Sequence, residues 1–208
     1  MKMLIFNPQK NVLNVAAFKK NVLGAGPGNR DVIWLQGCHI NCPSCANKDY
    51  IPHIKKKLMD ITVLIRHFKN RQSCIDGISV SGGEPTEQAQ ALIPLLATIQ
   101  DIGMTTVLYT GHTYEHLCQS DNHHIHDLLN YIDLLIDGPF ISKKVDYRMD
   151  WRGSQNQRLI HLSKRLKPEN QAQITGEIRL SNNTLMFNGC ASIPLLNNII
   201  QHMAADNE

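Results

Sequence analysis

The sequence predicts an α/β fold built around a parallel sheet. Short apolar runs rich in β-branched residues, which are typical of buried strands, alternate along the chain with stretches of helical periodicity. The strand-like runs end in three glycine-containing segments, QGC, SGGEP and TGHTYE. Parallel strands place their carboxyl ends on one rim of a sheet, and α/β proteins bind ligands there. We therefore expect the three segments to meet at one ligand-binding rim.

The first strand and helix surround a cysteine-rich loop. VIWLQG (residues 32–37) predicts a strand that ends at the first cysteine of that loop. Apolar residues then recur at helical spacing over residues 61–68, and Asp60 precedes them as a plausible N-cap. DGISVSGG (76–83) predicts the next strand, which two glycines close.

The second half of the predicted sheet follows the same order. EQAQALIPLLATIQDIG (87–103) predicts a helix that Pro94 should kink or restart. TTVLYTG (105–111) predicts a strand, a polar histidine-rich helical stretch follows, and YIDLLIDG (131–138) predicts another strand. This alternation predicts βαβ units.

The pattern changes after residue 162. SKRLKPENQAQ is polar, GEIRLSNNTLMFNG predicts two short strands around an Asn-Asn turn, and a helix is expected at the end of the chain. We expect a core in residues 1–162 and a C-terminal extension in residues 163–208, packed on the same domain.

Composition sets broad limits. A chain of 208 residues with 42% apolar and 19% charged residues is ordinary for one globular domain. A formal net charge of +3 is too small to indicate nucleic-acid binding. The first residues resemble no signal peptide, and no apolar run is long enough for a membrane span. We expect a cytoplasmic protein that binds neither nucleic acid nor membrane.

Three cysteines with the spacing C-x₃-C-x₂-C are the main chemical signal. Cys38, Cys42 and Cys45 have no fourth cysteine nearby, although structural zinc sites and ferredoxin clusters require four ligands. In a reducing compartment, clustered cysteines indicate metal ligation rather than disulfides. A cubane iron–sulfur cluster held by three thiolates has one iron with an open position for a substrate or cofactor.

SGGEP is the partner motif, and it ends the following strand. Gly82 and Gly83 allow backbone carbonyls to approach a ligand, Glu84 supplies a carboxylate for an ammonium group, and Pro85 ends the strand. Alone, SGGEP would more often be a plain strand-to-helix turn. One βα unit after the cysteines, it resembles the Gly-Gly-Glu-Pro of the radical S-adenosylmethionine (SAM) superfamily, whose cysteine signature is C-x₃-C-x₂-C.

Later motifs narrow the resemblance. TGHTYE (110–115), DGPF (137–140) and WRGSQNQR (151–158) are similar, in the same order, to segments of the activating enzymes of anaerobic ribonucleotide reductase. The likeness covers roughly residues 12–162, which would be the radical SAM core. It implies an incomplete parallel (β/α) barrel with the cluster near the carboxyl ends of the strands.

The resemblance implies cofactors and roles for individual residues. Cys38, Cys42 and Cys45 would hold a 4Fe-4S cluster whose unique iron binds SAM, and no protein residue would act as a catalytic nucleophile. The SAM contacts would come from Ser44 and Ala46 beside the third cysteine and from Gly82, Gly83 and Glu84. Trp151, Arg152 and Arg158 are candidates for the rim or for the SAM carboxylate, with buried packing an equal alternative for Trp151.

The same resemblance implies a reaction and partners. Reductive cleavage of SAM would give a 5′-deoxyadenosyl radical that takes hydrogen from a glycine Cα of a glycyl-radical enzyme such as anaerobic ribonucleotide reductase. A cytosolic one-electron donor would reduce the cluster. One alternative is a radical SAM enzyme that modifies a small molecule or peptide. Another is a non-enzymatic iron–sulfur or zinc-binding protein, which leaves SGGEP unexplained.

Several residues are given no functional role. Cys74, Cys118 and Cys190 are scattered singly and are expected to be free, buried thiols. The histidines of residues 116–126 and the lysines of residues 55–57 are expected on solvated surface. His112 replaces the tyrosine of the activases, a change that the sequence does not explain.

Overall fold

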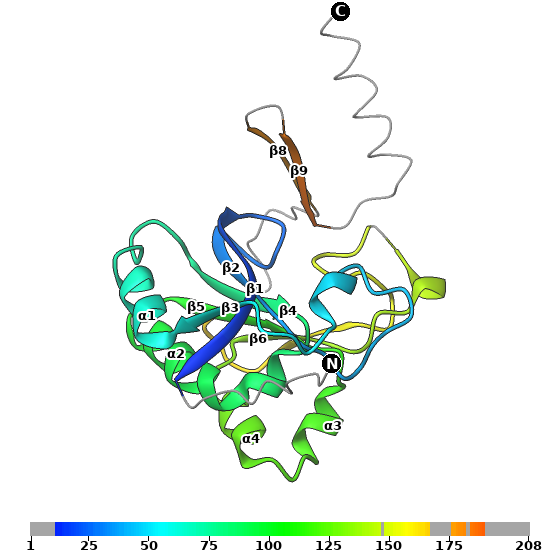
Figure 1. Cartoon of the computed structure of the whole chain (residues 1–208), viewed down its shortest axis with the longest axis horizontal. Coiled ribbons are helices and arrows are strands. Elements are labelled where there is room, and N and C mark those ends of the chain that lie inside the picture. Colours follow the sequence, from blue (N-terminus) through cyan, green and yellow to red (C-terminus); the bar gives the residue numbers. More distant parts are fainter. Residues whose placement is uncertain (1–10, 147, 167–175, 182–183, 190–208) are drawn as a thin grey trace, which may run out of the picture.

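A seven-stranded sheet in the order β3-β1-β2-β4-β5-β6-β7 forms the centre of the computed structural model (Figure 1). The structure describes residues 11–146 and 148–166 with their side chains, and 176–181 and 184–189 by their backbone. The strands of this sheet are β1 (Val12–Val22), β2 (Arg30–Leu35), β3 (Lys57–Asp60), β4 (Gly77–Gly82), β5 (Thr105–Tyr109), β6 (Leu134–Asp137) and β7 (Arg158–His161).

The middle of the sheet is parallel, as predicted. β2, β4, β5 and β6 pair in parallel in that order, so the segments that follow them leave from the same rim. Antiparallel strands flank them: β1 pairs with both β2 and β3, and β7 pairs with β6. The sheet stays open, and the predicted α/β fold with an incomplete parallel barrel is confirmed. β1 was missing from the prediction because VLNVAAFKKNV lacks a clear alternation of apolar and polar residues.

The helices begin and end largely as their sequence signals indicate. They are α1 (Ile61–Lys69), α2 (Ala89–Asp101), α3 (Tyr114–Cys118) and α4 (His123–Leu129), with 3₁₀ segments η1 (Lys48–Tyr50), η2 (Pro85–Gln88) and η3 (Ser142–Lys144). The Asp60 carboxylate accepts from the Thr62 N–H at 2.7 Å and so caps α1. α2 continues through Pro94 without restarting. Proline removes one hydrogen bond of the helix, and the buried apolar side chains around it hold α2 against the sheet.

Opposite faces of the sheet carry separate apolar clusters. Leu108 and Leu135 belong to the main core, which α1 and α2 cover. Val107 and Leu134, their neighbours in sequence, point to the other face and form a second cluster with Ile136 and Leu166. This division follows from the two-residue period of a strand. The second face matters for function, because aromatic residues of the ligand-binding rim pack against it.

The segment GPGNR lies at the rim opposite the cysteines and has a structural role. Arg30 is fully buried, and its guanidinium donates to Ser79 Oγ and to the Pro27, Ile78 and Thr105 carbonyls, among other acceptors. Burial lowers the pKa of Arg30 to about 10, so the side chain stays charged at neutral pH. It ties the loop before β2 to the beginnings of β4 and β5.

The C-terminal segment contains the predicted hairpin. β8 (Gly176–Ser181) and β9 (Thr184–Gly189) pair in antiparallel register, with Ser181 opposite Thr184. The predicted terminal helix lies outside the described residues, and the boundary between residues 162 and 163 stays a prediction.

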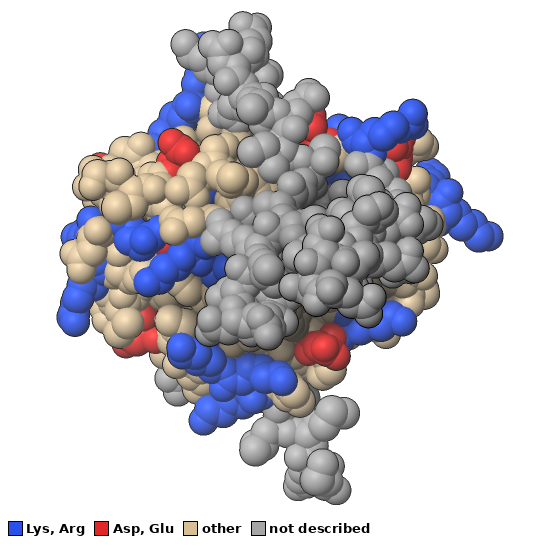
Figure 2. All heavy atoms as spheres, turned by 90° about the horizontal axis from the view of Figure 1, so that it is seen from above, with Lys and Arg blue, Asp and Glu red and all other residues tan. Residues whose placement is uncertain are grey.

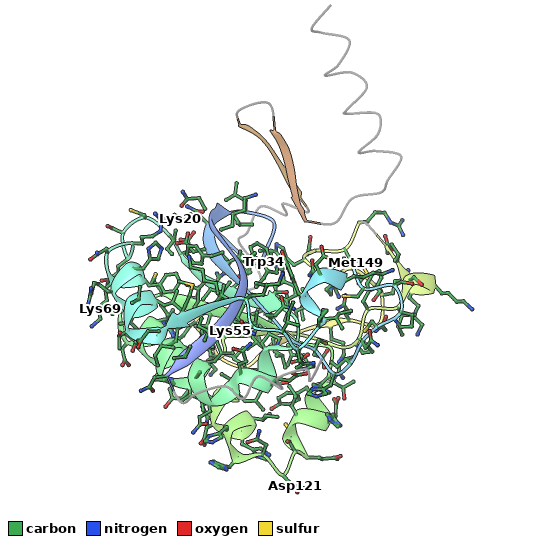
Figure 3. All side chains as sticks on the ribbon, in the orientation of Figure 1. Lys20, Trp34, Lys55, Lys69, Asp121 and Met149 are labelled. Carbon is green, nitrogen blue, oxygen red and sulfur yellow. The ribbon has the colours of Figure 1, made fainter. Side chains whose placement is uncertain are left out.

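Charged side chains are dispersed over the described surface. On the face in Figure 2, Lys and Arg lie in separate groups with Asp and Glu between them. The lysines of residues 55–57 are exposed, as expected, and Figure 3 shows Lys55 among them. Among the helices that the structure describes, none combines the length and the apolar character that crossing a bilayer requires.

Candidate functional site

A cavity of about 260 Å³ lies at the carboxyl ends of the parallel strands. Cys38, Cys42 and Cys45 line one side of it, and the SGGE segment after β4 lines the adjacent side. Thr110 and Gly111 follow β5 and contribute to the same lining. The predicted meeting of QGC, SGGEP and TGHTYE at one rim is therefore confirmed by the structure.

Backbone hydrogen bonds hold the cysteine loop in a defined shape. The Gly37 N–H donates to the Tyr50 carbonyl at 2.8 Å, and the Cys38 N–H donates to the Ile51 carbonyl at 3.0 Å. The Asn47 N–H donates to Cys45 Sγ at 3.3 Å. The loop thus returns on itself through η1 and presents its three cysteines to the cavity.

The thiols fit an iron–sulfur cluster. All three are free and half-buried, and they share one cavity without a fourth cysteine lining it. Burial raises the pKa of the Cys38 thiol, and the charges of Glu84 and Glu87 add to this effect. A metal cation reverses that preference and favours the thiolate. Three thiolate donors beside an open cavity suit a cluster with one iron left for another ligand.

Glu87 clamps the cysteine loop to η2. Its Oε1 accepts from the His39 N–H at 2.6 Å and lies 2.8 Å from His39 Nδ1. Its Oε2 lies 2.7 Å from Nε2 of the His53 ring. One carboxylate therefore connects both ends of the loop, next to Cys38, with the segment that follows SGGE. Sequence reasoning missed this contact because the three residues are far apart in the chain.

Close backbone packing explains the two glycines. The Gly83 N–H donates to the Leu35 carbonyl at 2.7 Å, and the next N–H, of Glu84, donates to the Gly37 carbonyl at 2.8 Å. A Cβ on Gly83 would overlap the Gly37 carbonyl oxygen, and Gly82 has a φ of +112°, which favours glycine. Glycine is required here because the SGGE segment and the cysteine loop are in direct backbone contact.

Glu84 is buried at the junction of two strand ends. Its Oε1 accepts from the Thr86 N–H at 3.0 Å, the Thr86 hydroxyl at 2.7 Å and the Thr110 hydroxyl at 2.9 Å. Its Oε2 accepts from the Gly111 N–H at 2.9 Å. The sequence predicted a SAM contact for this carboxylate. In addition, the structure gives it four donors within the protein, which join the rim after β4 to the rim after β5.

The segment between β6 and β7 forms the far wall of the cavity. Phe140, Trp151, Gly153 and Gln157 line it. The Gln157 side chain accepts from the Gly153 N–H at 2.8 Å and donates to the Gly138 carbonyl at 3.1 Å. This amide holds the DGPF and WRGSQNQR motifs together, a role that the motifs alone did not reveal. Figure 1 shows the segment, coloured yellow-green to yellow, beside the cyan cysteine loop.

The other predicted residues divide between the cavity and its surroundings. Ala46 lines the cavity, whereas Ser44 is exposed and lies outside its lining, so a SAM contact by Ser44 stays a prediction. Of the three candidates for the rim, Trp151 lines the cavity. Arg152 and Arg158 lie outside the lining, and Arg152 donates to the Asp150 carbonyl at 3.3 Å.

Arg158 takes part in an ion-pair network instead. It forms a two-bond pair with Glu115, at 2.9 and 2.7 Å, and it also donates to both carboxylate oxygens of Asp137. Asp137 Oδ2 in turn accepts from the Tyr114 N–H at 2.7 Å. The network joins β6, β7 and α3, so it fixes the position of the far wall.

Replacing Glu115 by glutamine is expected to reduce the sensitivity of the fold to acid. Hydrogen bonds from Arg158 lower the pKa of Glu115 from its usual 4.5 to about 2. A carboxylate with a lowered folded-state pKa stabilises the protein above its unfolded-state pKa and loses this contribution as the pH falls. The difference in unfolding free energy between wild type and Glu115→Gln should be constant from pH 7 to 5.5 and shrink below pH 4.5. Urea unfolding at several pH values measures it, and a difference that does not change with pH would contradict the prediction.

Two of the remaining cysteines differ from expectation. Cys74 and Cys118 are free, but they are exposed rather than buried: Cys74 lies in the turn between α1 and β4, and Cys118 is the last residue of α3. Cys190 lies outside the described residues. His116, His123 and His126 are exposed, as expected for a solvated surface, whereas His124 is half-buried.

Comparison with known proteins assigns the chain to a family. Residues 24–160 match the 4Fe-4S single cluster domain family. The anaerobic ribonucleoside-triphosphate reductase-activating protein of Vibrio cholerae is 32% identical over 150 residues, which cover 65% of this chain and 89% of that protein. This chain belongs to the family of these activating proteins, within the radical SAM superfamily. The activase is therefore a radical SAM enzyme that uses a 4Fe-4S cluster and SAM.

Two further similarities are more limited. A protein of Haemophilus influenzae, named putative glycyl-radical enzyme activating enzyme, is 37% identical to this chain over 92 residues. The match covers 43% of this chain and 35% of that protein. The crystal structure of QueE from Escherichia coli superposes with a TM-score of 0.42 and 18% identity, over 49% of this chain and 53% of that chain.

Proposed function

We propose that the activase takes a hydrogen atom from a glycine Cα of a large partner protein and so creates a glycyl radical. An anaerobic ribonucleoside-triphosphate reductase is the first candidate for the partner. The observation that carries this proposal is the 32% identity over 89% of the length of the Vibrio cholerae activating protein, whose name states that target.

In this proposal the cysteine motif binds the cluster and the SGGE segment binds SAM. Cys38, Cys42 and Cys45 ligate the cluster, and the open side of the cavity receives SAM. The Gly82 and Gly83 backbone carbonyls, with Glu84, receive its ammonium group, since glycine leaves those carbonyls unobstructed. When bound together, the reduced cluster and SAM supply one-electron cleavage of a carbon–sulfur bond and a 5′-deoxyadenosyl radical that accepts the hydrogen atom.

The protein's own contribution is position and exclusion of water. Hydrogen bonds to Glu84 fix the two strand ends against each other, and the Glu87 clamp fixes the cysteine loop beside them. Ala46 lies next to the third ligand, and the proposal also assigns a SAM contact to Ser44. A cytosolic one-electron donor reduces the cluster.

Isotope transfer tests the proposed reaction. The anaerobic reductase of the same organism would be produced with α,α-dideuterated glycine and incubated with the reconstituted activase, SAM and dithionite in the absence of oxygen. We expect deuterium in the 5′-deoxyadenosine and a glycyl-radical signal by electron paramagnetic resonance (EPR). Formation of unlabelled 5′-deoxyadenosine without that signal would reject this partner and favour a small molecule or peptide as the substrate.

A further inference from the structure

Trp151 carries an unsatisfied hydrogen-bond donor in the lining of the cavity. Its indole Nε1 is buried and has no hydrogen-bond partner in the described structure. Buried donors are nearly always paired in proteins, because the lost hydration must be replaced. A buried donor that is left unpaired in a residue of the cavity wall suggests a partner that a ligand supplies when it binds.

The backbone of Trp151 indicates that its position is imposed by its surroundings. Trp151 has a φ of +53°, in the left-handed region that bulky residues rarely adopt. The ring packs against the second apolar cluster, which contains Val107, Leu134 and Ile136. Unfavourable backbone conformations persist where packing holds them, and they concentrate at ligand-binding sites. Contacts of the indole ring with this apolar cluster thus hold Trp151 in its unfavourable backbone conformation, in the wall of the cavity.

The wall around Trp151 combines glycine backbone with aromatic side chains. Gly138 and Gly153 contribute backbone to it, and Phe140 contributes an aromatic face. A Cβ on Gly153 would lie 3.0 Å from the Phe140 ring, a tight contact, so glycine favours this close approach. Such a surface suits a planar peptide group better than a branched side chain, and an indole N–H suits a carbonyl oxygen.

We propose that Phe140, Trp151 and Gly153 form a subsite for a glycine-containing peptide backbone, in which the Trp151 N–H donates to a peptide carbonyl. The inference rests on the proposed function, since that function places SAM on the side of the cysteines and SGGE. The far wall belongs to the segment between β6 and β7, and a peptide bound there faces SAM across the cavity. SAM is the other possible source of an acceptor oxygen, and the experiment separates the two.

Trp151→Phe tests the subsite because it keeps an aromatic ring and removes the N–H. The probe is a capped pentapeptide with one α,α-dideuterated glycine, supplied to the reconstituted holoenzyme with SAM and dithionite. Three quantities are measured: the KM for the peptide from deuterium in 5′-deoxyadenosine, the Kd for SAM, and total 5′-deoxyadenosine without peptide. Trp34→Phe is the matched control, since Trp34 lies on β2 outside the cavity lining (Figure 3).

We expect Trp151→Phe to raise the peptide KM about 3- to 10-fold, as for one lost hydrogen bond. The SAM Kd should change less than the peptide KM, and Trp34→Phe should match wild type in both. A weaker SAM affinity with an unchanged peptide KM would overturn the proposal and assign the donor to SAM. Unchanged values for both ligands would overturn it, as would wild-type cleavage of SAM with no transfer of deuterium. The absence of any 5′-deoxyadenosine from wild type would instead reject the proposed function.

Discussion

Replacing Cys42 by alanine is expected to abolish SAM cleavage, whereas replacing Cys74 is expected to leave it unchanged. Cys42 lines the cavity together with Cys38 and Cys45, and Cys74 is an exposed free thiol outside the lining. With two thiolates left, the cluster would lose one of its three bonds to the protein, and the described lining of the cavity holds no other cysteine to replace it. Mutating residues that only support the ligands of a metal site lowers metal affinity or activity about 10- to 100-fold. Loss of a ligand itself should therefore lower the rate of 5′-deoxyadenosine formation by at least about 100-fold.

The measurement must separate loss of the cluster from loss of the fold. Iron and sulfide content and the EPR signal of the reduced cluster would be compared in wild type, Cys42→Ala and Cys74→Ala, together with urea unfolding of the three cluster-free proteins. We expect Cys42→Ala to retain its unfolding midpoint, since its side chain is only half-buried, and to lose the signal. A Cys42→Ala protein that keeps a reducible cluster and full cleavage would show that the ligands had been misassigned.

The rim of the sheet could be predicted because local chemistry determines it. Strand-like runs that end in glycine, with cysteines or SGGEP directly after them, fix where the backbone turns toward a ligand. The parallel order of the strands then brings these ends together, which is a general property of the fold rather than of particular contacts. The cysteines and the SGGE segment were located in this way, and the family signature agreed.

The side-chain contacts that hold the site in place could not be predicted from the sequence. Glu87 meets His39 and His53 across 48 and 34 positions, and no local pattern reports which carboxylate will accept from which histidine. The flanking strands β1, β3 and β7 also depend on long-range antiparallel pairing. Their sequences are too short or too irregular in polarity to show it.

Arg158 shows why residue type alone is a weak guide to role. A guanidinium near a ligand-binding rim suits a carboxylate of SAM as well as it suits Glu115 or Asp137. The structure has it paired with both of these acidic residues, so its charge is already compensated within the protein. The motif WRGSQNQR thus identified the correct segment, and Trp151 and Gln157 rather than the arginines line the cavity.

Glu84→Gln is expected to lower both stability and SAM cleavage. The carboxylate accepts four hydrogen bonds, from two hydroxyls and two backbone N–H groups. An amide has one acceptor oxygen, and its NH₂ would face donors of Thr86, Thr110 or Gly111. With the amide oxygen at the position of Oε1, the NH₂ would face the Gly111 N–H and leave this donor unpaired, so the free energy of unfolding should fall by about 3 kcal/mol. Displacement of the strand ends should slow SAM cleavage about 100-fold, as small misplacements in active sites do.

Unfolding of the protein without SAM separates two roles for Glu84. Thr110→Val removes one of the four donors and should cost about 1 kcal/mol, roughly a third of the effect of Glu84→Gln. Asp121→Asn, the same exchange at an exposed position between α3 and α4, should change neither stability nor cleavage (Figure 3). If Glu84 acted only by binding the ammonium group of SAM, Glu84→Gln would lose cleavage while the SAM-free protein unfolded like wild type. Parallel losses in Glu84→Gln and Thr110→Val would instead show that this carboxylate works by joining two strand ends, because only that role depends on its donors within the protein.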